Sequence, residues 1–336
     1  MSYLRTAGAV ILMMSSMTGA KEAVCPVRMR VHNFIVNPST GPVSEMTATN
    51  ITNVPVNAKL RVHYPTGWVV APTTQTLSLA PGESGIASFS IEKALESSEN
   101  NYEVTLEILI GKALYSHAQK VACASTPYYR PTIDGDLSEW NDAIPLSWVT
   151  REKKTVVRSY WNKKQFCLGV DVHEDELTDH DAIQFALAPG KIKTPTSREA
   201  QSNRYEFVVT GREGGKCYQL LSLGESMKQV SDTRDLQALV TKDAVVQVVR
   251  NGKVTQYELA LNLRAMRALR AAAGREYCFS LLVHDPTGTG LRDLGSLMTL
   301  RPAESDLAWS NWRGASWPDK KPFTGKIEFG FCSSIH

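Results

Sequence analysis

The stretch AVVQVVRNGKVTQYELAL, residues 244–261, decides the fold. Its two runs, 244–250 and 255–261, follow the alternation that gives a β-strand one apolar face. Between the runs stands Asn251-Gly252, a pair that favours the positive φ angles of a tight turn. The stretch therefore predicts a β-hairpin with a two-residue loop.

The β pattern covers the N-terminal third of the chain as well. Residues 58–64 place apolar side chains on one face, and the strand expected over 102–110 closes this unit. Pro, Gly, Asn and Ser residues mark turns between the runs. Trp68 directly follows the turn Pro65-Thr66-Gly67, and we expect it to anchor the core. Strands at this spacing predict a small β-sandwich.

Longer β segments follow from residue 131 onward. The predicted strands are 156–160, 166–172, 182–187, 205–210, 217–221, 244–250, 255–261, 277–284 and 326–331. Only 263–273 is predicted to be helical, because it is rich in Ala, Arg and Leu and stops before Gly274. About nine strands and one short helix predict a second, larger sandwich or jelly roll.

The length of 336 residues and the 43% hydrophobic content allow two cores rather than one. We therefore predict an all-β chain of two sandwich domains, over 25–124 and 132–332, joined by a Pro-containing linker at 125–131. The formal net charge is only +3, and no block of Lys or Arg stands out. This balance gives no indication of a nucleic-acid partner.

The first residues have the pattern of a secretory signal peptide over 1–20. Arg5 precedes the apolar run 7–14, and small residues follow it up to Ala20. The run is too short to span a bilayer, and no later segment is predicted to cross one. We expect an exported protein, periplasmic or extracellular after cleavage.

Export changes the interpretation of the six cysteines, because an oxidising compartment favours disulfides over metal-bound thiolates. No C-x-x-C pair is present. Cys25 and Cys123 bracket the first predicted domain, and we predict a disulfide between them. The pairing of Cys167, Cys217, Cys278 and Cys332 stays open.

Two regions of the chain resemble known families. Tyr64-Pro65-Thr66-Gly67-Trp68, Leu79-Ala80-Pro81-Gly82-Glu83-Ser84 and Phe89-Ser90-Ile91 resemble the immunoglobulin-like domain that accompanies alpha-galactosidases and other secreted glycosidases. The resemblance spans most of 30–115. It implies an immunoglobulin-like sandwich with a chiefly structural role.

The motif PTIDGDLSEW, residues 131–140, opens the second domain and is the most specific motif in the chain. It is followed, in order, by the segments 160–162, 166–175, 181–185, 257–261, 282–285 and 316–329. Together these segments resemble the family 9 carbohydrate-binding module over nearly all of 131–331. The resemblance implies a sugar-binding sandwich without catalytic activity, of a type attached to secreted glycoside hydrolases and able to bind calcium.

The same resemblance implies the site residues. Trp317 matches the stacking tryptophan of the family, and a pyranose ring packs well on an indole face. The facing aromatic is missing, because Thr178 stands in its place. Trp309 and Trp312 are the candidate substitutes. Polar contacts to sugar hydroxyls are expected from four residues: Gln184, Glu206, Asp285 and Arg292.

Calcium has two candidate sites in the sequence. Asp134, Asp136 and Glu139 offer three carboxylates within six residues, the hard oxygen ligands that calcium prefers. Alternatively, Asp134 forms a turn by accepting from backbone amides beside Gly135, with Trp140 packed in the core. The acidic stretch 174–181 is the second candidate.

Three other functions stay open. A glycoside hydrolase needs two carboxylates held across a cleft, and no motif places such a pair. A haem-binding electron-transfer domain would need ligands such as His284 with Met298 or Met266. A structural or protein-interaction role with a degenerate sugar site is the third alternative.

Overall fold

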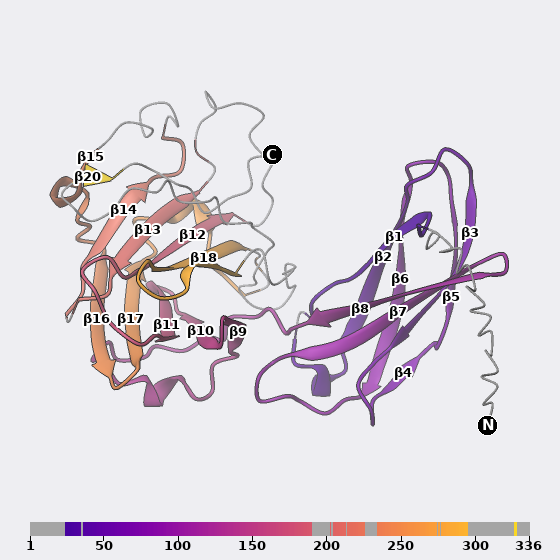
Figure 1. Cartoon of the computed structure of the whole chain (residues 1–336), viewed down its shortest axis with the longest axis horizontal. Coiled ribbons are helices and arrows are strands. Elements are labelled where there is room, and N and C mark those ends of the chain that lie inside the picture. Colours follow the sequence, from indigo (N-terminus) through magenta and orange to yellow (C-terminus); the bar gives the residue numbers. More distant parts are fainter. Residues whose placement is uncertain are drawn as a thin grey trace, which may run out of the picture.

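The chain folds into two β-rich lobes that lie side by side (Figure 1). The structure is a computed structural model, and it describes residues 24–34, 36–189, 202, 204–212, 214–225, 234–273, 275, 277–294 and 326–327. Every pairing between its strands is antiparallel. The predicted all-β sandwich fold is confirmed.

The smaller lobe packs two four-stranded sheets against each other, with the orders β1-β2-β6-β4 and β5-β3-β7-β8. A short 3-10 turn, η1 (Pro38–Thr40), follows β1. The strands are β1 (Val27–Val31), β2 (Val43–Asn50), β3 (Val56–His63), β4 (Val69–Ala71), β5 (Gln75–Leu79), β6 (Ser84–Lys93), β7 (Tyr102–Ile110) and β8 (Ala113–Val121).

Alternation builds the core of this lobe. Along β3 every second side chain is buried, beginning with Val56, while the residues between them are exposed. Trp68 stacks on Tyr64 with ring centroids 5.7 Å apart and meets Phe34 and Tyr102 at 5.7 and 5.3 Å. The expectation that Trp68 anchors the core is confirmed.

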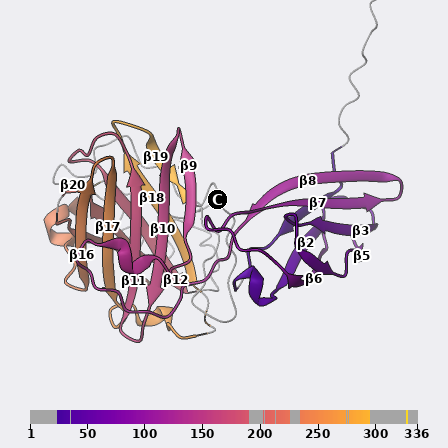
Figure 2. The same ribbon diagram turned by 90° about the horizontal axis from the view of Figure 1, so that it is seen from below.

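The larger lobe packs two five-stranded sheets, β16-β17-β11-β10-β9 and β14-β13-β12-β18-β19, seen from below in Figure 2. We call them the first and the second sheet. The strands are β9 (Leu146–Thr150), β10 (Lys153–Trp161), β11 (Gln165–His173), β12 (Ala182–Pro189), β13 (Tyr205–Thr210), β14 (Cys217–Leu221), β16 (Ala244–Asn251), β17 (Val254–Asn262), β18 (Tyr277–Asp285) and β19 (Gly290–Asp293). A separate two-stranded ladder joins β15 (Arg234–Asp235) to β20 (Lys326–Ile327). Three 3-10 turns complete the lobe: η2 (Leu137–Trp140), η3 (Leu236–Leu239) and η4 (Arg267–Leu269).

The predicted hairpin joins β16 to β17. Asn251 pairs with Val254, so the two-residue loop is Gly252-Lys253, one residue later than the Asn-Gly pair suggested. Gly252 has a φ of 58°, in the left-handed region that glycine adopts without steric cost. β17 then pairs with β11 over its whole length, which joins the hairpin at one edge of the first sheet to the rest of that sheet.

The predicted helix over 263–273 is wrong. The segment forms consecutive turns closed by hydrogen bonds three residues apart, such as Leu269 N to Met266 O at 3.0 Å. Arg270, with a φ of 49°, ends η4 after a single turn. Met266 and Leu269 are buried in the core, so tertiary packing overrides the helix propensity of the Ala-rich sequence. No helix in the described residues is long and apolar enough to cross a membrane.

The motif at 131–140 docks on the outer face of the first sheet. Trp140 is fully buried against Gly169, where an added Cβ would approach its indole ring to 2.9 Å. The Glu258 carboxylate accepts from Trp140 Nε1 at 2.8 Å and from the backbone amides of Asp134 and Gly135 at 2.8 and 2.7 Å. The expectation that Trp140 packs in a core is confirmed, in a small cluster outside the main one.

The predicted disulfide between Cys25 and Cys123 is wrong. Both residues are thiols in the structure. Cys25 lies in a groove with the start of β8, at Ala113 and Leu114, whereas Cys123 follows the end of that strand. The nine residues of β8 span about 30 Å, and a disulfide needs Cα atoms within about 7 Å.

The other described cysteines are thiols as well, and they lie on different surfaces of the larger lobe. Cys217 faces the main core between the sheets, Cys167 the outer face of the first sheet, and Cys278 the outer face of the second. A sheet therefore separates each of these thiols from the others. Cys332 lies outside the described residues, and so does the predicted signal peptide.

The two lobes meet through direct contacts. Asn100 Nδ2 donates to the carbonyl oxygen of Cys123 in its own lobe and to that of Pro145 in the other, at 2.8 and 2.9 Å. Ala122 and Ala124 pack into the core of the larger lobe, and Ile144 packs against that of the smaller lobe. The segment expected to be a linker begins with buried residues, since Ser125 and Thr126 are 2% and 0% exposed.

The Glu258 hydrogen bonds allow a test of how the motif is held. Glu258→Ala should lower the free energy of unfolding by about 3 kcal/mol, because three donors lose their only described acceptor. Glu258→Gln keeps an acceptor oxygen and should cost less. Urea unfolding would measure both, with Gln256→Ala on the same strand as control. Equal stability of Glu258→Ala and Gln256→Ala would contradict this account.

Candidate functional site

Three strands of the larger lobe have an acidic residue just beyond their core-facing side chains. Val170 and Val172 of β11 face the core, and Glu174 follows two residues later with the same parity. Asp181 stands two residues before Ile183 of β12, and Asp285 two residues after Val283 of β18. Period-2 alternation therefore aims all three acidic side chains toward one end of the core. We call Glu174, Asp181 and Asp285 the acidic cluster.

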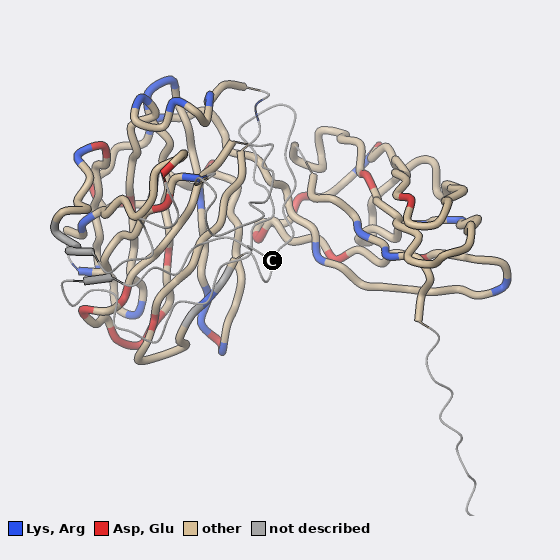
Figure 3. The backbone as a smooth tube through the Cα atoms, turned by 90° about the horizontal axis from the view of Figure 1, so that it is seen from above, with Lys and Arg blue, Asp and Glu red and all other residues tan. Residues whose placement is uncertain are grey.

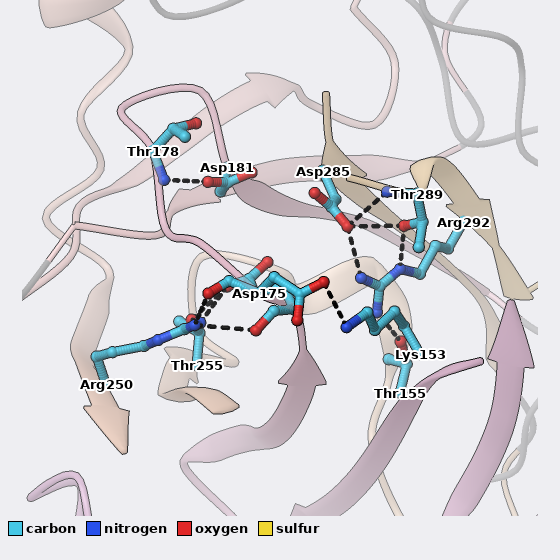
Figure 4. Close-up of polar contacts among 11 residues, drawn as sticks. Lys153, Thr155, Asp175, Thr178, Asp181, Arg250, Thr255, Asp285, Thr289 and Arg292 are labelled. Atoms are coloured by element: carbon cyan, nitrogen blue, oxygen red, sulfur yellow. Dashed lines mark hydrogen bonds and ion pairs between the residues drawn. The ribbon is translucent and has the colours of Figure 1, made fainter. Parts of the chain in front are cut away.

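Strand pairing and the packing of the two sheets bring the acidic cluster together. Ala182 pairs with His284, so Asp181 and Asp285 lie at adjacent strand ends of the second sheet. Glu174 comes from the first sheet. All three residues are buried, and one oxygen of each lies within 4.8 Å of one oxygen of each of the others. Figure 4 shows Arg250 and Arg292 approaching this region from two sides.

Protein donors hold one oxygen of Glu174 and one of Asp181. Glu174 Oε1 accepts from Arg250 Nη1 at 2.9 Å and from the Thr255 hydroxyl. Asp181 Oδ2 accepts from the backbone amide of Thr178. The remaining oxygens, Glu174 Oε2 and Asp181 Oδ1, are buried and accept no hydrogen bond from the described residues.

Asp285 is held in the same manner by a buried network. Its Oδ2 accepts from Thr289 N at 2.9 Å, from Thr289 Oγ1 at 2.8 Å and from Arg292 Nη2 at 2.7 Å. Arg292 also donates to Thr289 Oγ1 and Thr155 Oγ1, at 2.6 and 3.1 Å. The Arg292 guanidinium thus braces Asp285 directly and through Thr289.

The acidic cluster holds more negative than positive charge, because three buried carboxylates face only two arginines, Arg250 and Arg292. Burial raises the pKa of Glu174 to about 7, and the neighbouring carboxylates of Asp181 and Asp285 act in the same direction. Burial and Asp285 likewise raise the pKa of Asp181. The exposed Asp175 behaves oppositely, because hydrogen bonds from Lys153 and Lys253 lower its pKa to about 2. A bound cation would relieve the repulsion among the three carboxylates.

The donor set of the acidic cluster fits a hard divalent cation. All three groups are carboxylates, and two of them keep a buried oxygen that no described donor satisfies. Calcium takes six to eight oxygen ligands, so three carboxylates would leave room for carbonyl oxygens and water. Glu174, Asp181 and Asp285 could therefore hold calcium at the end of the sandwich. The sequence pointed to this acidic stretch only as its second candidate and did not connect it to Asp285.

A second polar group lies on the outer face of the second sheet. Gln184 Nε2 donates to Glu206, and its Oε1 meets His284 Nε2 at 3.0 Å. Arg204 Nε donates to Glu206 Oε2 at 2.9 Å. These side chains are buried, and Ala182, Ala186 and Ser280 share their face. We call Gln184, Arg204, Glu206 and His284 the polar row.

The predicted sugar contacts therefore divide between two faces. The structure brings Gln184 and Glu206 together in the polar row, whereas Asp285 and Arg292 face the other way, at the end of the core. Trp309, Trp312 and Trp317 lie outside the described residues. Thr178, in place of an aromatic, shapes the loop before β12 through its amide to Asp181.

Asp134, Asp136 and Glu139 are not brought together as a metal site. Asp134 Oδ1 accepts from Asp136 N at 3.0 Å, which is the turn expected as the alternative. Asp136 caps η2 through Ser138 N at 2.9 Å, and Glu139 accepts from Thr132 N at 2.6 Å. Each carboxylate thus stabilises a local backbone turn.

The haem ligands considered from the sequence do not form a pair in the described residues. His284 belongs to the polar row on the outer face, and burial lowers its pKa to about 4. Met266 is buried in the main core between the sheets. The second sheet therefore separates them. Met298 lies outside the described residues.

Sequence reasoning missed the position of Arg204 and the meeting of Glu174 with Asp285. These two acidic residues are 111 positions apart, and only the packing of the first sheet on the second brings them together. The available signal was positional, since Asp181 and Asp285 stand where two predicted core strands begin and end. Arg204 directly precedes β13, and its pairing with Glu206 is seen only in the structure.

The sequence matches no protein-family model and no curated protein. Among solved structures, a family 9 carbohydrate-binding module from Caldicellulosiruptor kristjanssonii in complex with cellotriose aligns with 55% of this chain and 92% of its own, at 10% identity and a TM-score of 0.37. The module from the same organism in complex with glucose covers 48% and 76%, at 13% identity and a TM-score of 0.33. A FixG-related protein from Vibrio parahaemolyticus covers 30% and 98%, at 15% identity and a TM-score of 0.23.

The acidic cluster predicts a calcium-dependent stability. Calcium at 100 times its Kd should stabilise the wild-type protein by about 2.7 kcal/mol over EDTA-treated protein. Asp181→Asn should remove this gain, because it replaces an anionic ligand beside two other carboxylates. Thermal unfolding with and without calcium measures the effect. Asp175→Asn, a change at an exposed neighbour outside the cluster, should keep the gain. An undiminished gain in Asp181→Asn would exclude the cluster as the site.

Proposed function

We propose that this chain is an exported, non-catalytic saccharide-binding protein whose larger lobe binds calcium in the acidic cluster. In this proposal the larger lobe, over 132–332, belongs with the family 9 carbohydrate-binding modules, and the smaller one, over 25–124, is an immunoglobulin-like spacer. The protein would act outside the cytoplasm, in the periplasm or medium, beside a glycoside hydrolase. The ligand is a neutral oligo- or polysaccharide.

One observation carries the proposal: the segments that resemble the family meet in space. Trp140, from the opening motif, donates to Glu258 from the segment at 257–261. Asp181 and Asp285, from two further segments, lie together in the acidic cluster. These residues are up to 145 positions apart in the chain. Residues that match one family and also share one sandwich support a common origin for the fold and its site.

Each group has a distinct part in this proposal. Trp317, with Trp309 and Trp312 as further candidates, offers the flat apolar surface on which the C–H face of a pyranose packs. Gln184 and Glu206 of the polar row stiffen the outer face of the second sheet through their hydrogen bonds. Calcium in the acidic cluster would fix the end of β18 and the loop before β12. Thr178 provides no second aromatic, so the sugar would be stacked on one side only.

The proposal is tested by calorimetric titration of the full chain, without its signal peptide, with neutral oligosaccharides such as cellotriose. Trp317→Ala should weaken binding by about 2 kcal/mol or more, as loss of an aromatic hot spot does. Tyr128→Ala, which removes an exposed aromatic of the linker segment, is the matched control and should bind normally. Removal of calcium with EDTA should weaken binding in both wild type and control.

Two outcomes would contradict the proposal. Absence of binding to every neutral glycan, with and without calcium, would favour a structural or protein-interaction role. Hydrolysis of any glycan by the purified chain would show an enzyme instead.

A further inference from the structure

A surface groove of about 360 Å³ lies at the opposite end of the first sheet from the acidic cluster. Its lining includes Ala244 and Ala260, near the start of β16 and the end of β17. The acidic cluster lies beyond the other end of β11, about 30 Å away for nine residues of strand. The groove is therefore separate from the site described above.

Four cationic residues belong to the lining of this groove. Arg130 comes from the segment between the lobes, Lys164 precedes β11, Lys242 precedes β16 and Arg264 follows β17. All four are exposed. Turns at neighbouring strand ends thus bring together charges that are far apart in the sequence, and Figure 3 shows neighbouring turns of this lobe that carry Lys and Arg. We call this feature the basic groove.

The cations of the basic groove are not neutralised by the described part of the protein. Asp243 is the one acidic residue of the lining, and its Oδ1 accepts from Asn262 Nδ2 at 3.0 Å. None of the four cationic heads forms an ion pair with a described residue. Elsewhere on the surface such pairs are common, for example Arg158 with Asp171 and Arg212 with Asp179, each at 2.7 Å.

The shape and lining of the basic groove indicate the class of its ligand. A hollow of this size accommodates a small ligand or one or two units of a chain. Guanidinium and ammonium groups bind carboxylates, and the side-chain amide of Gln165 can bind hydroxyls. No lining residue is aromatic, so the groove lacks the stacking platform on which single-stranded nucleic acids bind. Anionic groups next to hydroxyls are the chemistry of acidic sugars.

We propose that the basic groove binds an acidic saccharide, in which sugar units carry carboxylate or sulfate groups. The ligand class rests on the saccharide binding proposed above, but the site and its residues are independent of it. The protein would then bind both neutral and acidic sugar units. Such an arrangement suits a polysaccharide that contains both kinds of unit.

The test compares four probes in calorimetric titrations of the full chain: a tetragalacturonate, a sulfated oligosaccharide, cellotriose and a single-stranded oligonucleotide. The double variant Lys242→Gln/Arg264→Gln should weaken binding of the acidic saccharide about tenfold for each charge-assisted hydrogen bond that it removes. Lys120→Gln, which removes an exposed cation of β8 in the other lobe, is the control and should leave it unchanged. Raising sodium chloride from about 50 to about 500 mM should weaken the same binding.

The outcomes separate the two proposals. The tetragalacturonate and sulfate arms identify which anion the basic groove prefers, and binding of either one that depends on Lys242 and Arg264 supports it. No binding of either, or equal binding of the oligonucleotide, overturns it. Cellotriose binding should persist in the double variant, and acidic-saccharide binding should persist in Trp317→Ala. Loss of cellotriose binding alone would therefore not contradict the proposed binding of acidic saccharides in the basic groove.

Discussion

The pleat of the β-strand is the constraint on which this structure depends. Because successive side chains point to opposite faces, each strand of the larger lobe presents one row to the core and one to the outside. Glu174, Asp181 and Asp285 each lie two residues beyond the last core-facing side chain of a strand, and they therefore meet at one end of the core. The opposite parity sends Gln184 and Glu206 to the outer face. A shift of one residue in any of these strands would turn its core-facing side chains to the outer face and its acidic residue away from the cluster, so the register of the core and the geometry of the acidic cluster are specified together.

How much of this was predictable from sequence depended on the range of the interactions involved. The hairpin at Gly252 and the packing of Trp68 and Trp140 follow from local pattern, and they were foreseen. Helix propensity alone predicts a helix over 263–273. The turns that replace it depend on the burial of Met266 and Leu269 in the core, which propensity does not report. The acidic cluster needed contacts across more than a hundred residues, which a single sequence does not report. The Cys25–Cys123 pairing was wrong for the same reason, because composition and compartment say nothing about which end of β8 a thiol occupies.

The larger lobe uses charge differently at its two ends. At one end carboxylates are buried, close together and braced by Arg250 and Arg292, an arrangement that favours a bound cation. At the other end, exposed cations surround small side chains in the basic groove. Buried charge is costly unless it is compensated, whereas exposed charge costs little. Charge in the acidic cluster therefore affects the stability of the fold, whereas the exposed cations of the basic groove affect it little.

The hydrogen bonds made by Asn100 have a mechanical consequence. One side-chain amide joins the last residues of the smaller lobe to Pro145 of the larger one, and Glu99 beside it is paired with Lys154 at 2.6 Å. Bending between the lobes would have to break these bonds and expose Ala122 and Ala124. The smaller lobe is thus a rigid extension of the larger one, and a force applied to either lobe would be transmitted to the other without bending at the junction.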